Sequence, residues 1–251
     1  LTFDDGYIDH YKYVYPYLLK KKICGCFYPP IKILKQKIVL NVNKIQFILE
    51  RQKNRKQILN ELNIFLKKRF DFDIDKINLK KLNLYYKRKD ITSNRYDDKE
   101  TTMIKQLLQN YLPEKLRNKS CEYLFSKFVN KDSNKFAKEI YMSLSNIREM
   151  NNDKMHIGSH GVNHCYWKFL TKKKQEDEIK KSLMYFKRNK INVKNFSVCY
   201  PYGSFNKDTK NILVKYNAKF GLTTEVGNIK NTIKFNRFQL PRYDTNDFLD
   251  F

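Results

Sequence analysis

Two histidines and a pair of aspartates are the residues of this sequence best suited to hold a metal ion. His160 and His164 lie four positions apart, which places two imidazoles on one face of a helical turn and supplies two ligands in many zinc sites. Asp4 and Asp5 are adjacent near the start of the chain. Each motif also has an ordinary interpretation, a solvated turn for the histidines and a helix cap for Asp4-Asp5-Gly6.

The positions of both motifs at predicted strand ends favour the metal site. Residues 1–3 end one predicted strand, directly before Asp4, and residues 157–158 end another, shortly before His160. Parallel strands gather their carboxyl ends on one face of an α/β fold, where sites are built. One carboxylate and two imidazoles then form a three-ligand site with an open position for water, and the second carboxylate is free to act as general base.

The other two histidines fit this arrangement less well. His156 has the same spacing to His160, but it is predicted to lie within the strand, before the turn. His10 falls on the first predicted helix and is interpreted as a surface residue, with a catalytic acid as its second interpretation. The later pair is therefore the preferred ligand pair.

The elements that would position these residues alternate along the chain. A strand, a helix over residues 7–22 that Pro16 kinks or divides, and a strand over residues 23–28 are typical of a parallel α/β sheet or barrel. Residues 31–150 are rich in Lys, Leu, Ile and Asn with helical periodicity, and we interpret them as a helical insertion within one domain spanning 1–251. Strands are predicted again near residues 155–158, 196–200 and 220–224, with helices at 175–186 and 207–214.

Composition limits the class of protein. Hydrophobic residues make up 41% of the 251 residues and aromatic residues 15%, which is a globular profile. The net charge of +25 indicates either attraction to polyanions or codon-driven drift toward lysine, and the even spread of basic residues favours drift. No nucleic-acid-binding motif accompanies the charge, and no apolar run reaches the length of a membrane span. The chain starts at Leu1 inside a predicted strand, so we expect a segment upstream of it.

Several segments resemble motifs of one enzyme family, in the right order. Residues 1–7 (LTFDDGY) resemble the first motif of the polysaccharide deacetylases, the NodB-homology group or carbohydrate esterase family 4. Residues 157–164 (IGSHGVNH) resemble the second motif and residues 196–203 (FSVCYPYG) the third. Residues 222–225 and 240–242 are similar to C-terminal segments of the poly-N-acetylglucosamine deacetylase branch. An ordered series is stronger evidence than any single motif.

The resemblance implies a fold, a reaction and a cofactor. The implied fold is a distorted (β/α) barrel of the NodB-homology type, with the helical insertion after the second strand. The implied reaction is removal of acetyl groups from N-acetylated sugars of a polysaccharide or oligosaccharide, with a divalent metal, zinc, as cofactor. By motif position, Asp5, His160 and His164 bind the metal and Asp4 is the base. Many members carry an arginine at the position of Cys199, and Arg242 is expected to replace it as a cation beside Asp4, with an ordinary salt bridge as the alternative.

The third motif implies residues that contact the substrate. Tyr200, Pro201, Tyr202 and Trp167 are expected to line the sugar, and a backbone N–H near Tyr202 to hold the oxyanion; packing at the barrel rim is the alternative. The family's general acid is a histidine, and none follows His164; in the poly-N-acetylglucosamine branch it precedes the first motif, upstream of this chain. A catalytically impaired carbohydrate-binding protein is therefore the alternative function. The resemblance favours the cell envelope or secretion, and a cytoplasmic location stays open.

Overall fold

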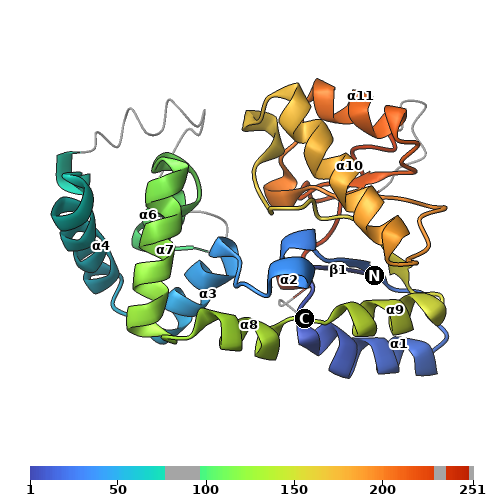
Figure 1. The fold of residues 1–251 in the computed structure, drawn as a ribbon, viewed down its shortest axis with the longest axis horizontal. Helices are drawn as coiled ribbons and strands as arrows, with labels where there is room; N and C mark the ends of the chain where they lie inside the picture. The colour runs from blue at the N-terminus through green and yellow to red at the C-terminus, as the bar shows by residue number, and fades with distance from the viewer. Residues whose placement is uncertain (77–96, 229–235, 249–251) are drawn as a thin grey trace. The chain divides into compact units, whose positions relative to one another are not determined.

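The structure of this chain is a computed structural model, and it describes residues 1–76, 97–228 and 236–248 (Figure 1). By its contacts the chain forms two compact units. The first contains Leu1–Ile38 and Ala137–Phe251, and the second contains Val39–Phe136. All of the residues singled out by their chemistry in the sequence belong to the first unit.

Parallel strands form the centre of the first unit. Three of them pair in the order β1 (Thr2–Asp4), β2 (Cys26–Tyr28) and β3 (His156–Ile157), and two more, β4 (Val198–Cys199) and β5 (Gly221–Leu222), form a second pair. Isolated parallel bridges join Ser159 to Val198 and Leu222 to Leu240, so the pairing continues from one set of strands to the next. Parallel pairing aligns the carboxyl ends of all these strands on one side. That alignment brings the end of β1 near the turn that follows β3.

Helices surround these strands. The helices of the first unit are η1 (His10–Val14), α1 (Tyr15–Lys20), α2 (Ile31–Gln36), α9 (Leu144–Asn152), α10 (Lys172–Arg188) and α11 (Lys207–Lys215), with short 3-10 turns η4 (Trp167–Phe169), η5 (Pro201–Gly203) and η6 (Thr245–Phe248). Pro16 lies in the first turn of α1, where its missing N–H is tolerated, and the π-helical stretch η1 directly precedes it. A capping box between Ser143 and Asn146 starts α9.

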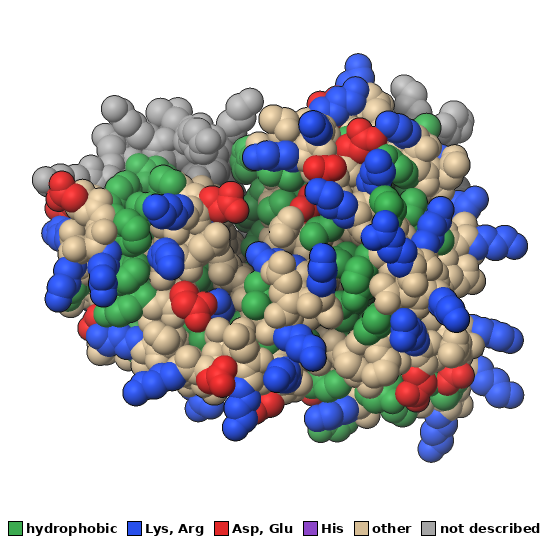
Figure 2. Space-filling view, in the orientation of Figure 1, with side chains coloured by type: hydrophobic (Ala, Val, Ile, Leu, Met, Phe, Trp, Pro, Cys, Tyr) green, Lys and Arg blue, Asp and Glu red, His purple; other side chains and the backbone are tan. Residues whose placement is uncertain are grey.

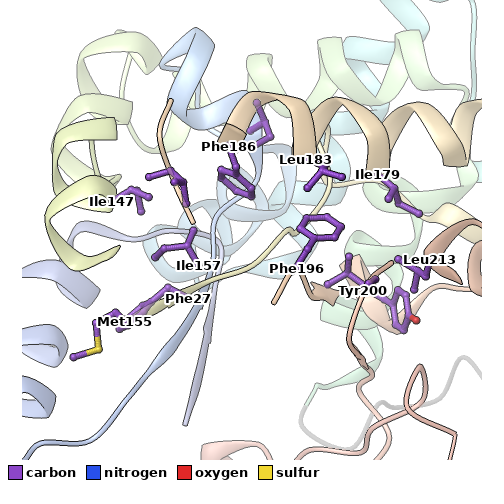
Figure 3. Packing of buried hydrophobic residues seen from close by; sticks show 14 of the residues in the cluster. Phe27, Ile147, Met155, Ile157, Ile179, Leu183, Phe186, Phe196, Tyr200 and Leu213 are labelled. Carbon is purple, nitrogen blue, oxygen red and sulfur yellow. The ribbon is translucent and has the colours of Figure 1, made fainter. Parts of the chain in front are cut away.

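The core of the first unit lies between α10 and the strands (Figure 3). Ile179 and Phe186 are fully buried on one face of α10, and they pack in the same cluster as Phe27, Ile157 and Phe196. Burial of each such side chain stabilises the fold by about 1.5–3 kcal/mol relative to its exposure. These contacts hold helix α10 rigidly against the strands. The same helix also contacts the loop between His160 and His164.

The second unit is helical in its described part. Its helices are α3 (Asn41–Arg51), α4 (Arg55–Phe70), η2 (Ile74–Lys76), α6 (Lys99–Gln106), η3 (Leu107–Tyr111) and α7 (Glu114–Phe128), and α8 (Ser133–Ile140) begins in it. Ile45, Ile58, Leu62 and Leu124 are fully buried there and agree with the helical periodicity of the sequence. The interpretation of residues 31–150 as an insertion within a single domain stays a prediction.

On the face shown in Figure 2, basic side chains are distributed and do not form one bank. Figure 2 shows lysine and arginine side chains over the whole visible face of the first unit, with aspartate and glutamate among them. This distribution agrees with the spread of basic residues along the sequence. Of the helices in the described ranges, none combines the length and the apolar character that crossing a membrane requires.

Candidate active site

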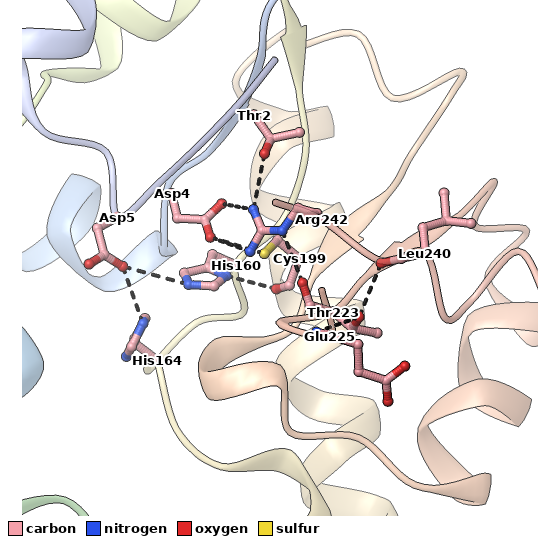
Figure 4. A network of polar contacts seen from close by, with 10 residues as sticks. All are labelled: Thr2, Asp4, Asp5, His160, His164, Cys199, Thr223, Glu225, Leu240 and Arg242. Atoms are coloured by element: carbon pink, nitrogen blue, oxygen red, sulfur yellow. Dashed lines mark hydrogen bonds and ion pairs between the residues drawn. The ribbon is translucent and has the colours of Figure 1, made fainter. Parts of the chain in front are cut away.

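Asp5, His160 and His164 converge on one point (Figure 4). The Nε2 atom of His164 lies 3.2 Å from Oδ1 of Asp5, and the Nε2 atom of His160 lies 3.6 Å from the same oxygen. The side chains of the two histidines are only 4% and 5% exposed, and that of Asp5 is 14% exposed. The first strand and the turn after β3 therefore bring together residues that are more than 150 positions apart.

A backbone contact fixes the orientation of His160. Its Nδ1 lies 2.7 Å from the carbonyl oxygen of Cys199. A carbonyl only accepts hydrogen bonds, so Nδ1 carries the proton and the lone pair is on Nε2, which faces Asp5. Burial lowers the pKa of His160 and so favours the neutral imidazole that a metal ligand needs.

This donor set fits a divalent metal ion. Ligands at about 2.1 Å from a tetrahedral zinc lie about 3.4 Å from one another. The separations of 3.2 and 3.6 Å between Asp5 and the two imidazoles bracket that value. One carboxylate and two imidazoles also leave coordination positions open for water and substrate. Asp5, His160 and His164 would hold the ion.

Asp4 lies beside this donor set, with a carboxylate oxygen within 4.8 Å of a ring nitrogen of His160, and it pairs with an arginine. The alternation of β1 places Thr2 and Asp4 on one face of the strand, while Phe3 stacks on Phe27 on the other. Arg242 donates from Nη1 to Oδ1 of Asp4 at 3.1 Å and from Nη2 to Oδ2 at 2.8 Å (Figure 4). Such a bidentate pair fixes both the position and the plane of the carboxylate.

Arg242 is itself anchored on both sides. Its Nε donates to the carbonyl oxygen of Thr223 at 3.0 Å, and its Nη1 donates to Oγ1 of Thr2 at 3.1 Å. The backbone N–H of Arg242 donates to the carbonyl oxygen of Glu225 at 2.8 Å. The guanidinium thus links the segment beside β5 to β1, and it lies on Asp4 as the sequence analysis expected.

Cys199 completes the surroundings of Asp4. Its Sγ donates to Oδ2 of Asp4 at 3.2 Å, and burial raises the pKa of the thiol well above its usual range, so the sulfur keeps its proton. Burial alone would raise the pKa of Asp4, but the charge of His160 in its protonated form and the guanidinium of Arg242 outweigh it and hold that pKa below its ordinary value. Arg242 carries the permanent charge in this group. Asp4 is therefore a carboxylate at neutral pH.

Two of the site residues adopt unusual backbone conformations. Asp5 has a φ of 65° and His164 a φ of 52°, both in the left-handed region that non-glycine residues seldom occupy. Such conformations cost about 1–3 kcal/mol and persist only where the surrounding structure over-determines them. The loops that carry these two residues must therefore be held by contacts other than their own conformational preference.

The remaining histidines lie outside this donor set, and the interpretation of one of them was wrong. His10 is not a surface residue: its ring packs against Phe3 at 5.5 Å and Phe27 at 6.1 Å, and burial lowers its pKa. The amphipathic pattern predicted the helix but not how closely this position approaches the strands. His156 lies in β3, as predicted, and its Nε2 is 2.7 Å from Oγ of Ser197.

The aromatic residues expected to contact substrate divide into two groups. Trp167 and Tyr200 are 0% and 1% exposed, and their rings meet edge to face at 5.8 Å inside the core. Pro201 is buried as well. Their side chains offer no free face to a sugar, which favours the packing alternative for these three residues. Tyr202 is half-buried, has a φ of 58°, and meets the ring of His164 edge to face at 4.8 Å.

Tyr166 lies beside the donor set, and the sequence did not single it out. Its ring stacks on Tyr202 with centroids 4.0 Å apart and an interplanar angle of 2°. Together the two rings form an aromatic pair beside His164. The position of Tyr166, two residues after His164, could have indicated this contact. An aromatic residue in that position can also be interpreted as core packing.

Comparison with known proteins decides the family. The sequence pattern described as polysaccharide deacetylase matches residues 96–221, which is just over half of the 251 residues. The chain belongs to the polysaccharide deacetylase family. This assignment confirms the family resemblance inferred from the motifs. The matched segment contains His160, His164 and Cys199. A comparison with curated proteins gave no match.

Solved structures of deacetylases resemble the chain in fold. The deacetylase PplD of Streptococcus pyogenes, solved in complex with acetate, is 17% identical, with a TM-score of 0.51 over 96% of this chain and 62% of that chain. The BpsB deacetylase domain of Bordetella bronchiseptica is 15% identical, with a TM-score of 0.49 over 96% and 69% of the two chains. The chain thus spans less than two thirds of the PplD chain. At such identity the likeness to PplD supports the mixed arrangement of helices and strands and nothing finer.

Proposed function

We propose that this chain is a metal-dependent deacetylase that hydrolyses the acetamido group of N-acetylated sugars in a polysaccharide or oligosaccharide. The observation that carries the proposal is the convergence of Asp5, His160 and His164, with Asp4 held alongside by Arg242. Three protein ligands beside a separate, charged carboxylate suit hydrolysis at a metal.

Each residue then has a defined task. A divalent ion, which we propose to be zinc, supplies Lewis-acid polarisation of the amide carbonyl and lowers the pKa of water at the site. Asp4 accepts the proton of the attacking water as general base, because its lowered pKa keeps it ionised. Arg242 and the Cys199 thiol hold the Asp4 carboxylate in place through three hydrogen bonds. A backbone N–H near Tyr202 would donate to the oxyanion.

The aromatic pair suggests where the sugar lies. Tyr202 and Tyr166 are both half-buried and adjoin His164. Rings of this kind offer an apolar face and a hydroxyl to a sugar ring. We therefore retain Tyr202 as a substrate contact and add Tyr166 to it.

The finer architecture is part of the same proposal. Parallel pairing continues from β1 through β5 to Leu240, and the side chain of Arg242 returns to Thr2 and Asp4 of β1. This connection supports a distorted (β/α) barrel. In the described part of the chain, the side chain of Arg242 closes it, and not a pair of hydrogen-bonded strands. Residues 31–150 are the helical insertion of that barrel. A polysaccharide substrate favours a location of the protein in the cell envelope or outside the cell.

Acetate release tests the proposal. The zinc-loaded protein is incubated with N-acetylated chitooligosaccharides and with poly-N-acetylglucosamine fragments, and acetate is measured by a coupled assay. Asp4→Asn should lower kcat about 10²–10⁴-fold, the usual contribution of a general base. His160→Ala should lose both bound zinc and activity, whereas His156→Gln, a histidine outside the donor set, should keep both. The absence of acetate release from the zinc-loaded wild-type protein on all of these glycans would refute the proposal.

A further inference from the structure

A buried carboxylate outside the metal site contacts the loop between the two histidine ligands. Glu178, on α10, is 5% exposed. Its Oε2 accepts hydrogen bonds from the backbone N–H groups of Val162 at 2.7 Å and Asn163 at 3.0 Å, and its Oε1 accepts from Nδ2 of Asn163 at 2.6 Å. These donors lie between His160 and His164 in the sequence.

The opposite side of the same loop is held as well. The carbonyl oxygen of Gly161 accepts from the backbone N–H of Ile31 at 3.0 Å, and that of Val162 accepts from Lys32 at 2.9 Å. Gly161 has a φ of 76°, and a Cβ there would lie 2.8 Å from Oε2 of Glu178. Only glycine lets the loop approach the carboxylate so closely. The loop is thus bonded on one side through its N–H groups and on the other through its carbonyls.

The charged side chain of Glu178 would destabilise the fold in this buried place unless hydrogen-bond donors compensated it. Burial of a carboxylate is unfavourable without hydrogen-bond partners, and Glu178 recovers that cost through three N–H donors. These contacts also support the backbone of His164, because its φ of 52° lies in the left-handed region and persists only where the surroundings hold it. Because α10 is packed rigidly on the core, Glu178 transmits that rigidity to the loop.

We propose that Glu178 is a positioning residue that holds His160 and His164 in the separation and orientation that metal binding needs. This inference rests on the proposed metal site and names a residue that supports it from behind. Partners of this kind around a metal site typically change metal affinity about 10–100-fold when they are lost. Glu178 touches neither the ion nor the substrate, so its effect reaches the metal only through the loop.

Zinc titration of the metal-free protein tests the proposal with two opposed variants. Glu178→Asp keeps the charge but shortens the side chain, so it loses contact with at least one of the two backbone N–H groups. Glu178→Gln keeps the length, because its amide oxygen still accepts from both N–H groups and Asn163 can rotate its own amide to match. We expect Glu178→Asp to weaken zinc binding about 10–100-fold and Glu178→Gln to weaken it less than about 10-fold.

The control is Asp177→Asn, the neighbouring carboxylate on α10, which forms an exposed ion pair with Lys181. It should bind zinc as the wild type does. Hydrogen exchange of the metal-free protein provides a second measurement, in which the Val162 and Asn163 amides should exchange faster in Glu178→Asp than in Glu178→Gln.

The possible results separate the inference from the proposed function. Wild-type protein that binds no zinc would refute the proposed metal site, while the exchange rates would still decide whether Glu178 holds the loop. A second outcome is that the wild type binds zinc and the affinity depends on the charge at position 178. Glu178→Asp would then bind zinc like the wild type and Glu178→Gln would not, and this result would overturn the positioning role. Equal affinity in all variants would overturn it as well.

Discussion

Removal of the guanidinium from Asp4 is the perturbation that most directly tests the proposed mechanism. Arg242 makes two charge-assisted hydrogen bonds to Asp4, at 2.8 and 3.1 Å. Each such bond contributes about 1.5–3 kcal/mol. Arg242→Lys keeps the positive charge but not the planar fork, so at most one of the two bonds can reform. Loss of one bond in the transition state corresponds to a decrease in kcat of about 10–150-fold.

Arg242→Met removes the charge as well and should have a second effect. Burial acts to raise the pKa of Asp4, and without the guanidinium less opposes it. A base with a raised pKa becomes protonated at higher pH, so the acidic limb of the kcat/KM profile should move upward. In Arg242→Lys the retained charge should leave that limb closer to the wild-type position. The decrease in kcat for Arg242→Met should approach the full contribution of a general base, about 10²–10⁴-fold.

The assay is acetate release from an N-acetylated chitooligosaccharide, measured from pH 5 to 9 with zinc-saturated protein. Arg237→Met is the matched control, because Arg237 is exposed in the same segment and its guanidinium lies over the ring of Phe238, 4.7 Å from the centroid. It should leave both kcat and the pH profile unchanged. Rates within a factor of about two of wild type for both Arg242 variants, with an unshifted acidic limb, would refute the assignment of Arg242 as the residue that holds the base.

Two further predictions concern the interior of the first unit. Gly158→Ala should lower the free energy of unfolding by about 1–3 kcal/mol in urea titration, because a Cβ there would lie 2.2 Å from the ring of Tyr28; an unchanged midpoint would contradict this packing. Burial lowers the pKa of His156 below its ordinary 6.5, so the stability it contributes is present above that pH and is lost as pH falls through the lowered value. His156→Gln should therefore unfold with a weaker dependence on pH between 7 and 5, and an equal dependence in both proteins would contradict the assignment.

Short sequence motifs were sufficient to predict which side chains of the candidate site lie together. Asp4 and Asp5 were identified at the end of one strand and His160 and His164 in the turn after another, because parallel strands align their carboxyl ends on one side. Helices were predicted correctly where the apolar periodicity is clear, as in α10. These features depend on neighbours along the chain, and such local preferences can be inferred before any packing is known.

Features that depend on which elements pack together were determined only by the tertiary structure. Trp167 and Tyr200 have side chains that suit a sugar platform as well as a core, and only their contacts place them in the core. His10 is half-buried against Phe3 and Phe27, which come from strands and not from its own helix. In the sequence, Glu178 cannot be distinguished from the other charged residues of this lysine-rich helix. Its contacts with Val162 and Asn163 form only when α10 packs against the strands. The sequence by itself determined which groups can do the chemistry, and folding decided which groups hold them, because burial and long-range hydrogen bonds exist only after the chain has packed.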